Sequence, residues 1–198
     1  MRPDNLLFDQ RDTVSREKPM SLLDKAIAAV TPPESDEARA KARAKAEAAA
    51  KSGDWLSQIL QHHRQIEAAF AELKTTSDPD ARRAAQKKLG LILAGHSIAE
   101  EAAIYPALAA EHQVGHAELA YQEQSAAKME MGLLERLDPM SEDYLDKLGH
   151  IEGAVAHHMY SEEGTWFLKL AEEADAAEQA LIAKRYSEAY ERYMGVER

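Results

Sequence analysis

The sequence predicts an all-α protein, an up-down-up-down four-helix bundle with additional helices at its N-terminal and C-terminal ends. Alanine, glutamate, lysine and leucine dominate the composition, and aromatic residues make up only 6% of the chain, which is typical of helical proteins. Most prolines stand at breaks between segments in which apolar residues recur at helical spacing. Four of these segments are long enough to form the helices of a bundle.

The first 53 residues are expected to lie outside this bundle. Residues 1–19 are polar and aperiodic, and we expect them to be a flexible N-terminal extension. Residues 20–53 are expected to form a short helix at 22–30 and then an Ala-rich charged helix that begins at Ser35. Because this second helix has little apolar surface to bury, it is expected on the outside of the bundle.

The bundle itself is predicted at residues 54–170, and a C-terminal amphipathic helix is predicted within residues 171–198. Breaks at Ser77-Asp78-Pro79 and Asp138-Pro139 separate the apolar stripes of the bundle. The four bundle helices are expected at residues 54–74, 79–110, 114–137 and 141–170. Because the breaks between them are short, successive helices are expected to be antiparallel.

The charge and the lack of cysteine exclude several classes of function. The chain has 24 basic and 35 acidic residues, a net charge of −11 with histidine neutral. This balance argues against nucleic acid and anionic membrane surfaces as partners. Without cysteine there is no disulfide, zinc–thiolate site or cysteine nucleophile. No apolar run approaches the ~20 residues of a membrane span, so we expect a cytoplasmic protein.

Histidines on the apolar stripes point to a buried polar site. His63, His96 and His158 lie on three different predicted bundle helices, each at helical spacing from apolar residues. A single inward-facing histidine is more often a satisfied core residue than a ligand. Three of them on separate helices would each need a buried partner, which favours a shared site.

Two of these histidines belong to an internal repeat. Each copy reads His-x-x-x-Glu-Glu, then three residues, an aromatic residue and, three positions on, leucine; the copies are HSIAEEAAIYPAL at 96–108 and HMYSEEGTWFLKL at 158–170. His96 with Glu100, and His158 with Glu162, therefore project an imidazole and a carboxylate from one helix face. Unpaired inward carboxylates are costly, and a metal cation would neutralise them. Imidazole and carboxylate without sulfur suit iron or manganese and do not exclude zinc.

The other two bundle helices are expected to supply the remaining ligands. On the first helix, His63 fits the apolar stripe best. On the third, a chain turn near residues 111–112 brings Gln124 opposite Glu100, whereas a turn at Pro106 would bring a histidine pair to that level. We prefer Gln124, because the apolar pattern of the second helix continues beyond the proline. The alternative ligands that stay open are His62, His112, His116 and His157.

These residues resemble the hemerythrin-like family, also called the HHE cation-binding domain, over about residues 54–170. The matching pieces are HHRQI at 62–66, HSIAEE at 96–101 with Tyr105-Pro106, and HHMYSEE at 157–163. The resemblance implies a bundle that holds a non-heme di-iron centre with histidines as terminal ligands and two bridging carboxylates. Carried over to this sequence, it implies His63, His96 and His158 as terminal ligands and Glu100 and Glu162 as bridges.

The sequence departs from the family pattern at two places. Glu123-Gln124 stands where relatives commonly have a Glu-His pair, so Gln124 is expected either to be an amide ligand or to hydrogen-bond a bound water. This leaves open whether one or two metal ions bind. Phe167-Leu168 stands where the family usually has Phe-Pro. The rival ferritin-like bundles use Glu-x-x-His, and no histidine here has glutamate three residues before it.

The resemblance implies a stress-response protein that binds or senses O₂, peroxide or nitric oxide at iron, or that handles iron. We expect binding or sensing rather than committed catalysis, with weak peroxidase or nitric-oxide chemistry as a side activity. The expected partner is therefore a small diatomic ligand or peroxide. The alternative is a metal-free helical scaffold that keeps the fold and acts through protein contacts. Gln124 supports this alternative, and the flanking helices could also form a homodimer.

Overall fold

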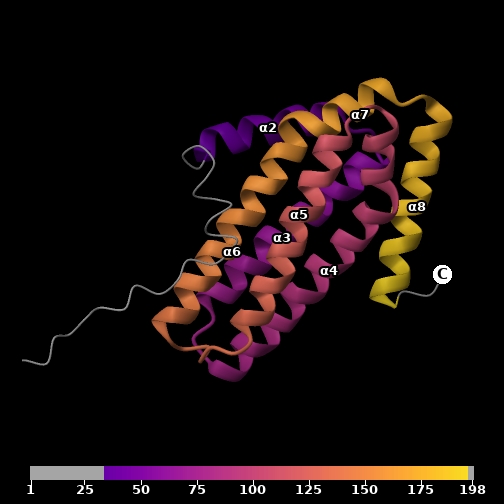
Figure 1. The fold of residues 1–198 in the computed structure, drawn as a ribbon. Helices are drawn as coiled ribbons and strands as arrows, with labels where there is room; N and C mark the ends of the chain where they lie inside the picture. The colour runs from indigo at the N-terminus through magenta and orange to yellow at the C-terminus, as the bar shows by residue number, and fades with distance from the viewer. Residues whose placement is uncertain (1–33, 196–198) are drawn as a thin grey trace, which may run out of the picture.

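Helices account for all regular secondary structure in the computed structural model, which describes residues 34–195 (Figure 1). No strand occurs among these residues, so the predicted all-α class is confirmed. The expected extension at residues 1–19 and the expected short helix at 22–30 lie outside the described residues.

Four helices joined by short loops form the bundle, and their bounds lie close to those predicted. They are α3 (Trp55–Thr75), α4 (Pro79–Ala110), α5 (Val114–Leu134) and α6 (Glu142–Ser161). Side chains cap three of the four helix starts, where Asp54, Asp78 and Ser141 each accept a hydrogen bond from the backbone N–H three residues on. The sequence breaks before residues 79 and 142 are therefore true helix boundaries.

Two helix ends differ from the prediction. α5 ends at Leu134 rather than Leu137, because the backbone N–H groups of residues 136 and 137 bond to carbonyl oxygens three residues back and tighten the chain into a turn. The fourth helix does not run unbroken to residue 170. A π-helix, η1 (Glu162–Trp166), follows α6, and α7 (Phe167–Glu173) completes the helix. Such π-turns are frequent at functional sites, and this one begins at a predicted metal ligand.

Two flanking helices pack on the bundle (Figure 1). α2 (Asp36–Ala49) lies against η1, α7 and α3, and it buries only the small side chains of Ala42 and Ala46. α8 (Ala176–Met194) runs beside α4 and buries Ile182 and Tyr186. Both helices therefore reach elements that carry predicted site residues.

The buried apolar residues form two clusters at successive levels of the bundle. The first cluster includes Trp55, Leu60, Leu108, Phe167 and Leu170. The second includes Phe70, Leu89, Leu134, Tyr144 and Leu148. Between these levels each bundle helix carries a buried polar residue, namely His63, His96, Gln124 and His158. The polar residues therefore lie in a layer of the core with apolar packing on both sides.

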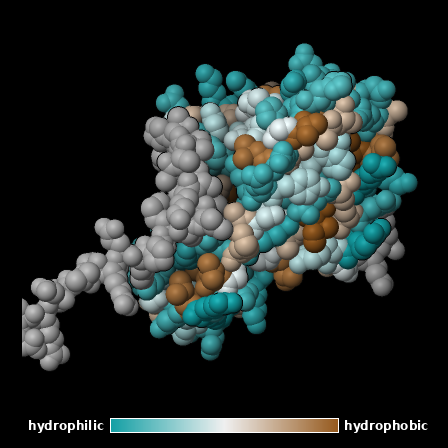
Figure 2. Space-filling model, viewed as in Figure 1, coloured by the Kyte–Doolittle hydropathy of each residue, from teal (hydrophilic) through white to brown (hydrophobic). Residues whose placement is uncertain are grey.

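The surface is mixed in polarity. On the face shown in Figure 2, hydrophobic residues form small areas between hydrophilic ones. Among the described helices, none combines the length and the hydropathy needed to cross a membrane.

Candidate metal centre

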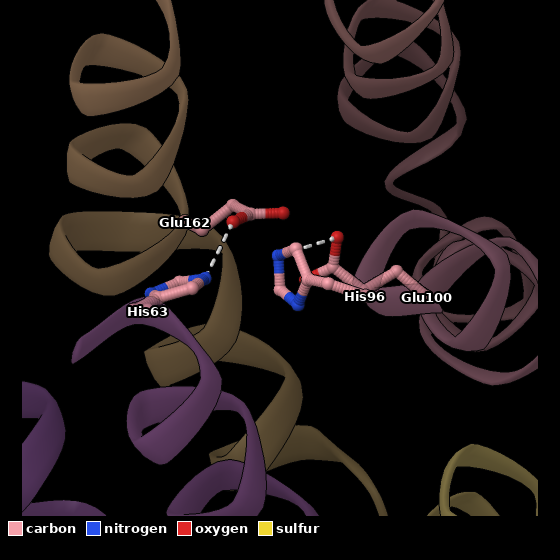
Figure 3. Close-up of side chains that lie close together, drawn as sticks. All are labelled: His63, His96, Glu100 and Glu162. Atoms are coloured by element: carbon pink, nitrogen blue, oxygen red, sulfur yellow. Dashed lines mark ion pairs between the residues drawn. The ribbon is translucent and has the colours of Figure 1, made fainter. Parts of the chain in front are cut away.

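Four predicted ligands converge between α3, α4 and η1 (Figure 3). One ligand atom from each of His63, His96, Glu100 and Glu162 lies within 4.8 Å of the others. His96 is 3% exposed and the other three are 0% exposed. The cluster is therefore sealed from solvent, and its polar atoms must find their partners inside the protein.

The inward atoms of this cluster lack those partners. Within the described residues, the Nε2 atoms of His63 and His96, Oε1 of Glu100 and both carboxylate oxygens of Glu162 make no hydrogen bond. His63 Nε2 lies 3.4 Å from Glu162 Oε2, and His96 Nε2 lies 3.3 Å from Glu100 Oε2. Atoms that share a cation at bond lengths of about 2.1 Å lie about 3 Å apart. A divalent cation among these atoms would satisfy them together, so the residues present fit a metal.

His158 and Gln124 extend the cluster on the other side of Glu162 and Glu100. His158 Nε2 lies 3.2 Å from Glu162 Oε1, so the two oxygens of this carboxylate face different histidines. Gln124 donates a hydrogen bond of 2.5 Å to Glu100 Oε2, and its own Oε1 is buried without a partner within the described structure. All six predicted site residues therefore line one continuous polar region.

Each of the three predicted histidine ligands has a hydrogen-bond partner at Nδ1, on the side of the ring away from the cluster. The partner of His63 is Glu163 Oε1 at 2.6 Å, and the partner of His158 is Glu123 Oε2 at 2.8 Å. His96 instead pairs with the hydroxyl of Tyr186 at 3.1 Å. Outer hydrogen bonds of this kind fix the tautomer and the ring orientation of metal-binding histidines, and here they leave all three Nε2 atoms directed inward.

Further residues that we did not assign to the site complete these contacts. Glu163 accepts a hydrogen bond of 2.7 Å from Arg43 of α2, and Tyr105 donates one of 3.1 Å to Glu100. Glu163 and Tyr105 lie inside the repeat, so their place in the motif was a usable signal. Arg43 and Tyr186 lie on the flanking helices, where no pattern in the sequence marks them.

The charges of the clustered side chains shift one another's pKa values. Burial alone would lower the pKa of His63, but the nearby carboxylates of Glu162 and Glu163 raise it to about 9. Burial would raise the pKa of Glu162, but the charges of His158 and His63 hold it below its usual value. Burial and the charge of Glu162 raise the pKa of Glu100 well above its usual value. Burial and the charge of His63 lower the pKa of His96. In the metal-free site His63 and Glu162 therefore favour each other's charged forms, whereas burial favours the neutral forms of His96 and Glu100.

The alternative histidines have other surroundings. His62 bonds through Nδ1 to Tyr186 at 2.7 Å, and His157 bonds through Nδ1 to Glu34 at 2.6 Å. His116 stacks on the ring of Trp166, and His112 is exposed with a φ of 61°. None of these four belongs to the converging group.

A helical bundle whose core holds converging imidazoles and carboxylates defines a metal-binding helical domain. The chain belongs to the hemerythrin HHE cation-binding domain family, whose profile matches residues 55–185. The resemblance predicted from the repeat is therefore confirmed, and the matched range contains all six predicted site residues.

A more distant similarity extends to a larger protein. A DNA nickase of Nostoc sp. (strain PCC 7120) is 26% identical to the chain over 109 residues, which are 55% of this chain and 31% of the nickase. The chain therefore spans less than a third of the length of this relative. No solved structure matches the chain.

Proposed function

We propose that the buried site holds a non-heme di-iron centre that binds or senses O₂, peroxide or nitric oxide, or takes part in iron handling. One observation carries this proposal. Among the described residues, inward nitrogen and oxygen atoms on three helices lack any hydrogen-bond partner, although they lie at the spacing of ligands around a cation. Imidazoles and carboxylates without sulfur are a donor set that suits iron.

Two metal ions would be held by different histidines. His63 and His96 would hold one of them and His158 the other, with Glu162 and Glu100 as the carboxylates available to both. Gln124 would supply an amide oxygen on the side of His158. Support comes from the contacts of Glu162, whose two oxygens lie 3.4 Å from His63 and 3.2 Å from His158.

The protein's own contribution is to hold these ligands and to keep water away. Because apolar clusters lie on both sides of the polar layer, only small molecules are expected to reach the site. When bound, a reduced iron pair supplies electrons to O₂, peroxide or nitric oxide. None of the six predicted site residues is left over as an acid–base pair beside the ligands, which favours binding or sensing over committed catalysis, with weak peroxidase or nitric-oxide chemistry as a side activity.

The partner is a small ligand rather than DNA. The net charge of −11 opposes binding to phosphates, and the alignment with the nickase covers only 31% of that protein. The expected cytoplasmic location and a homodimer through the flanking helices remain predictions of the proposal.

The decisive experiment is a metal analysis of the full chain purified from iron-supplemented cells, with absorption spectra before and after exposure to air. Two irons per chain and an oxo-to-iron band in the near ultraviolet would support the di-iron proposal. One metal per chain would mean that Gln124 leaves the second position weak. His96→Ala should lose the metal, whereas His112→Asn, at an exposed position with positive φ that asparagine tolerates, should keep it.

The alternative is a metal-free scaffold that acts through protein contacts. It is favoured by the hydrogen bonds that Gln124 and Tyr105 donate to Glu100, which partly satisfy the site without a cation. In that case the purified chain would contain no metal and still melt cooperatively, and His96→Ala would be neutral or stabilising, since it removes a buried imidazole whose Nε2 has no hydrogen-bond partner within the described residues.

A further inference from the structure

Tyr186 connects the C-terminal helix α8 to the candidate metal centre. Its ring is 0% exposed, and its hydroxyl oxygen lies 3.1 Å from His96 Nδ1 and 2.7 Å from His62 Nδ1. The family profile ends at residue 185, one residue before this tyrosine. The contact is therefore a feature of this chain that the family assignment does not cover.

Gly95 allows α8 to approach α4 beside the ligand His96. A Cβ atom at this position would lie 3.1 Å from Met194 Sδ and 3.2 Å and 3.3 Å from the rings of Tyr193 and Tyr190. Glycine inside a helix is destabilising by about 1 kcal/mol relative to alanine, so it needs a local reason. Here the reason is the close packing of α8 on the turn that carries His96.

The hydrogen bonds around Tyr186 have one consistent direction if His96 binds a metal. Coordination through Nε2 leaves the proton on Nδ1, so Nδ1–H donates to the tyrosine oxygen. The single hydroxyl proton of Tyr186 then points to His62 Nδ1 as acceptor. His62 is itself held by stacking on Tyr190, with ring centroids 3.9 Å apart and an interplanar angle of 22°.

We propose that Tyr186 is a positioning residue of the metal centre and that α8 is an integral part of this centre. Tyr186 fixes the tautomer and orientation of His96 and is anchored in turn by His62. The inference rests on the proposed metal-binding function. It also makes the three histidines unequal, because His63 and His158 are held by carboxylates and His96 by a neutral phenol, which is the weaker acceptor.

Cobalt(II) added to the metal-free full chain provides the test, since proton NMR then shows hyperfine-shifted, exchangeable N–H signals from each ligating histidine. Tyr186→Phe keeps the ring and removes only the hydroxyl. We expect one of three N–H signals to shift and to exchange faster with solvent, and the affinity for cobalt(II) to fall about tenfold. Tyr193→Phe removes the hydroxyl of an exposed α8 tyrosine and should leave all three signals and the affinity unchanged.

The outcomes separate the inference from the proposed function. If the wild-type chain binds cobalt(II) and Tyr186→Phe keeps all three signals in place, the role of Tyr186 is wrong while metal binding stands. If the wild-type chain binds no cobalt(II), both are wrong. Gly95→Ala serves as a second variant, should Tyr186→Phe fail to fold. It keeps the phenol, but the side chains of Met194, Tyr193 and Tyr190 on α8 must give way to the new Cβ, and the same single N–H signal should be perturbed; an unchanged spectrum would contradict the inference.

Discussion

The two copies of the repeat begin with the same residues but are built into different surroundings. The first copy, residues 96–108, lies in the continuous helix α4. The second copy, residues 158–170, spans α6, the π-helix η1 and α7. The comparison shows how one ligand motif, used twice, produces a site with unlike halves.

The first glutamates of the two copies, Glu100 and Glu162, differ most in their hydrogen bonds and pKa shifts. Glu100 accepts hydrogen bonds from Tyr105 and Gln124, and its pKa is raised well above the usual value by burial and by the charge of Glu162. Neither oxygen of Glu162 has a hydrogen-bond partner within the described residues. The second copy has Phe167 at the place of Tyr105, and a phenyl ring cannot donate. The neutral form is therefore favoured for Glu100 in the metal-free site, whereas Glu162 keeps two oxygens that a cation could satisfy.

The second glutamates of the two copies, Glu101 and Glu163, also have different surroundings. Glu101 is partly exposed and pairs with Lys128 on the surface, whereas Glu163 is 2% exposed and bonds to His63 and Arg43. The π-helix of the second copy begins at Glu162 and places both of its glutamates inside the protein. The motif alone therefore does not decide how many carboxylates a copy contributes, because the partners of Glu163 come from α2 and α3.

The largest expected effect is that of Glu162→Gln, compared with Glu100→Gln in the other copy. Because the oxygens of Glu162 face both His63 and His158, its loss should weaken both metal positions. We expect a fall in metal affinity of more than 100-fold, about 3 kcal/mol, measured by competition with a chelator. An equal or larger loss in Glu100→Gln would contradict the proposed asymmetry.

The variants Glu162→Gln and Glu100→Gln should also differ in thermal stability when no metal is present. Glutamine has the shape of a protonated glutamic acid, so Glu100→Gln should hardly change the melting temperature, because burial and the charge of Glu162 already favour the neutral form of Glu100 there. Glu162→Gln removes the partner of charged His63 and should lower the melting temperature. Thermal denaturation in the presence of a chelator would measure both changes.

The next effect is a pH dependence of the metal-free protein. The pKa of His63 is about 9 in the fold and about 6.5 in an unfolded chain. A raised pKa contributes stability that is complete below about pH 6.5 and is lost as pH rises through about 9. This difference corresponds to an order of 3 kcal/mol in the free energy of unfolding. Urea denaturation of wild type and His63→Gln between pH 6.5 and 9 should show a steeper decline for the wild type, and parallel curves would contradict the assignment.

A smaller effect on metal affinity is expected when the second glutamate of each copy, Glu101 or Glu163, is substituted by glutamine. Glu163→Gln weakens the acceptor behind His63 and should lower metal affinity about tenfold, as for other outer partners of metal-binding histidines. Glu101→Gln is the matched control, since it removes only a surface ion pair and should leave metal affinity unchanged. Equal affinities in the two variants would mean that the carboxylate of Glu163 beside His63 has no bearing on metal binding.

The sequence predicts the residues that depend on local spacing. His96 with Glu100, and His158 with Glu162, are one helical turn apart, so their shared face follows from helix geometry alone. To predict Gln124 as a site residue, only the position of the chain turn after α4 was needed. The bounds of α4 were predicted at residues 79–110 and are Pro79–Ala110, because Asp78 and Pro79 mark the start unambiguously.

The residues that form hydrogen bonds on the outer side of the predicted ligands could not be predicted in the same way. Arg43 reaches Glu163 across 120 residues of sequence, and Tyr186 reaches His96 across 90. Such contacts depend on how α2 and α8 dock, which no local pattern determines. The π-helix was missed as well. It packs against α2, where Gly164 lies beside Ala42 with 3.5 Å between the Ala42 Cβ and a Cβ built at the glycine, and no local pattern shows such a contact.

The smallest expected effect concerns the aromatic residues of the two copies. Tyr105→Phe makes the first copy resemble the second by removing the donor to Glu100 while keeping the ring. A single hydrogen bond is worth about 1 kcal/mol, so metal affinity should change by about fivefold, measured by the same chelator competition. Because Glu100 loses a partner that lowers its pKa, its proton should become harder to displace, and affinity should fall most at acidic pH. A change that is equal across the pH range would mean that Tyr105 acts through packing alone.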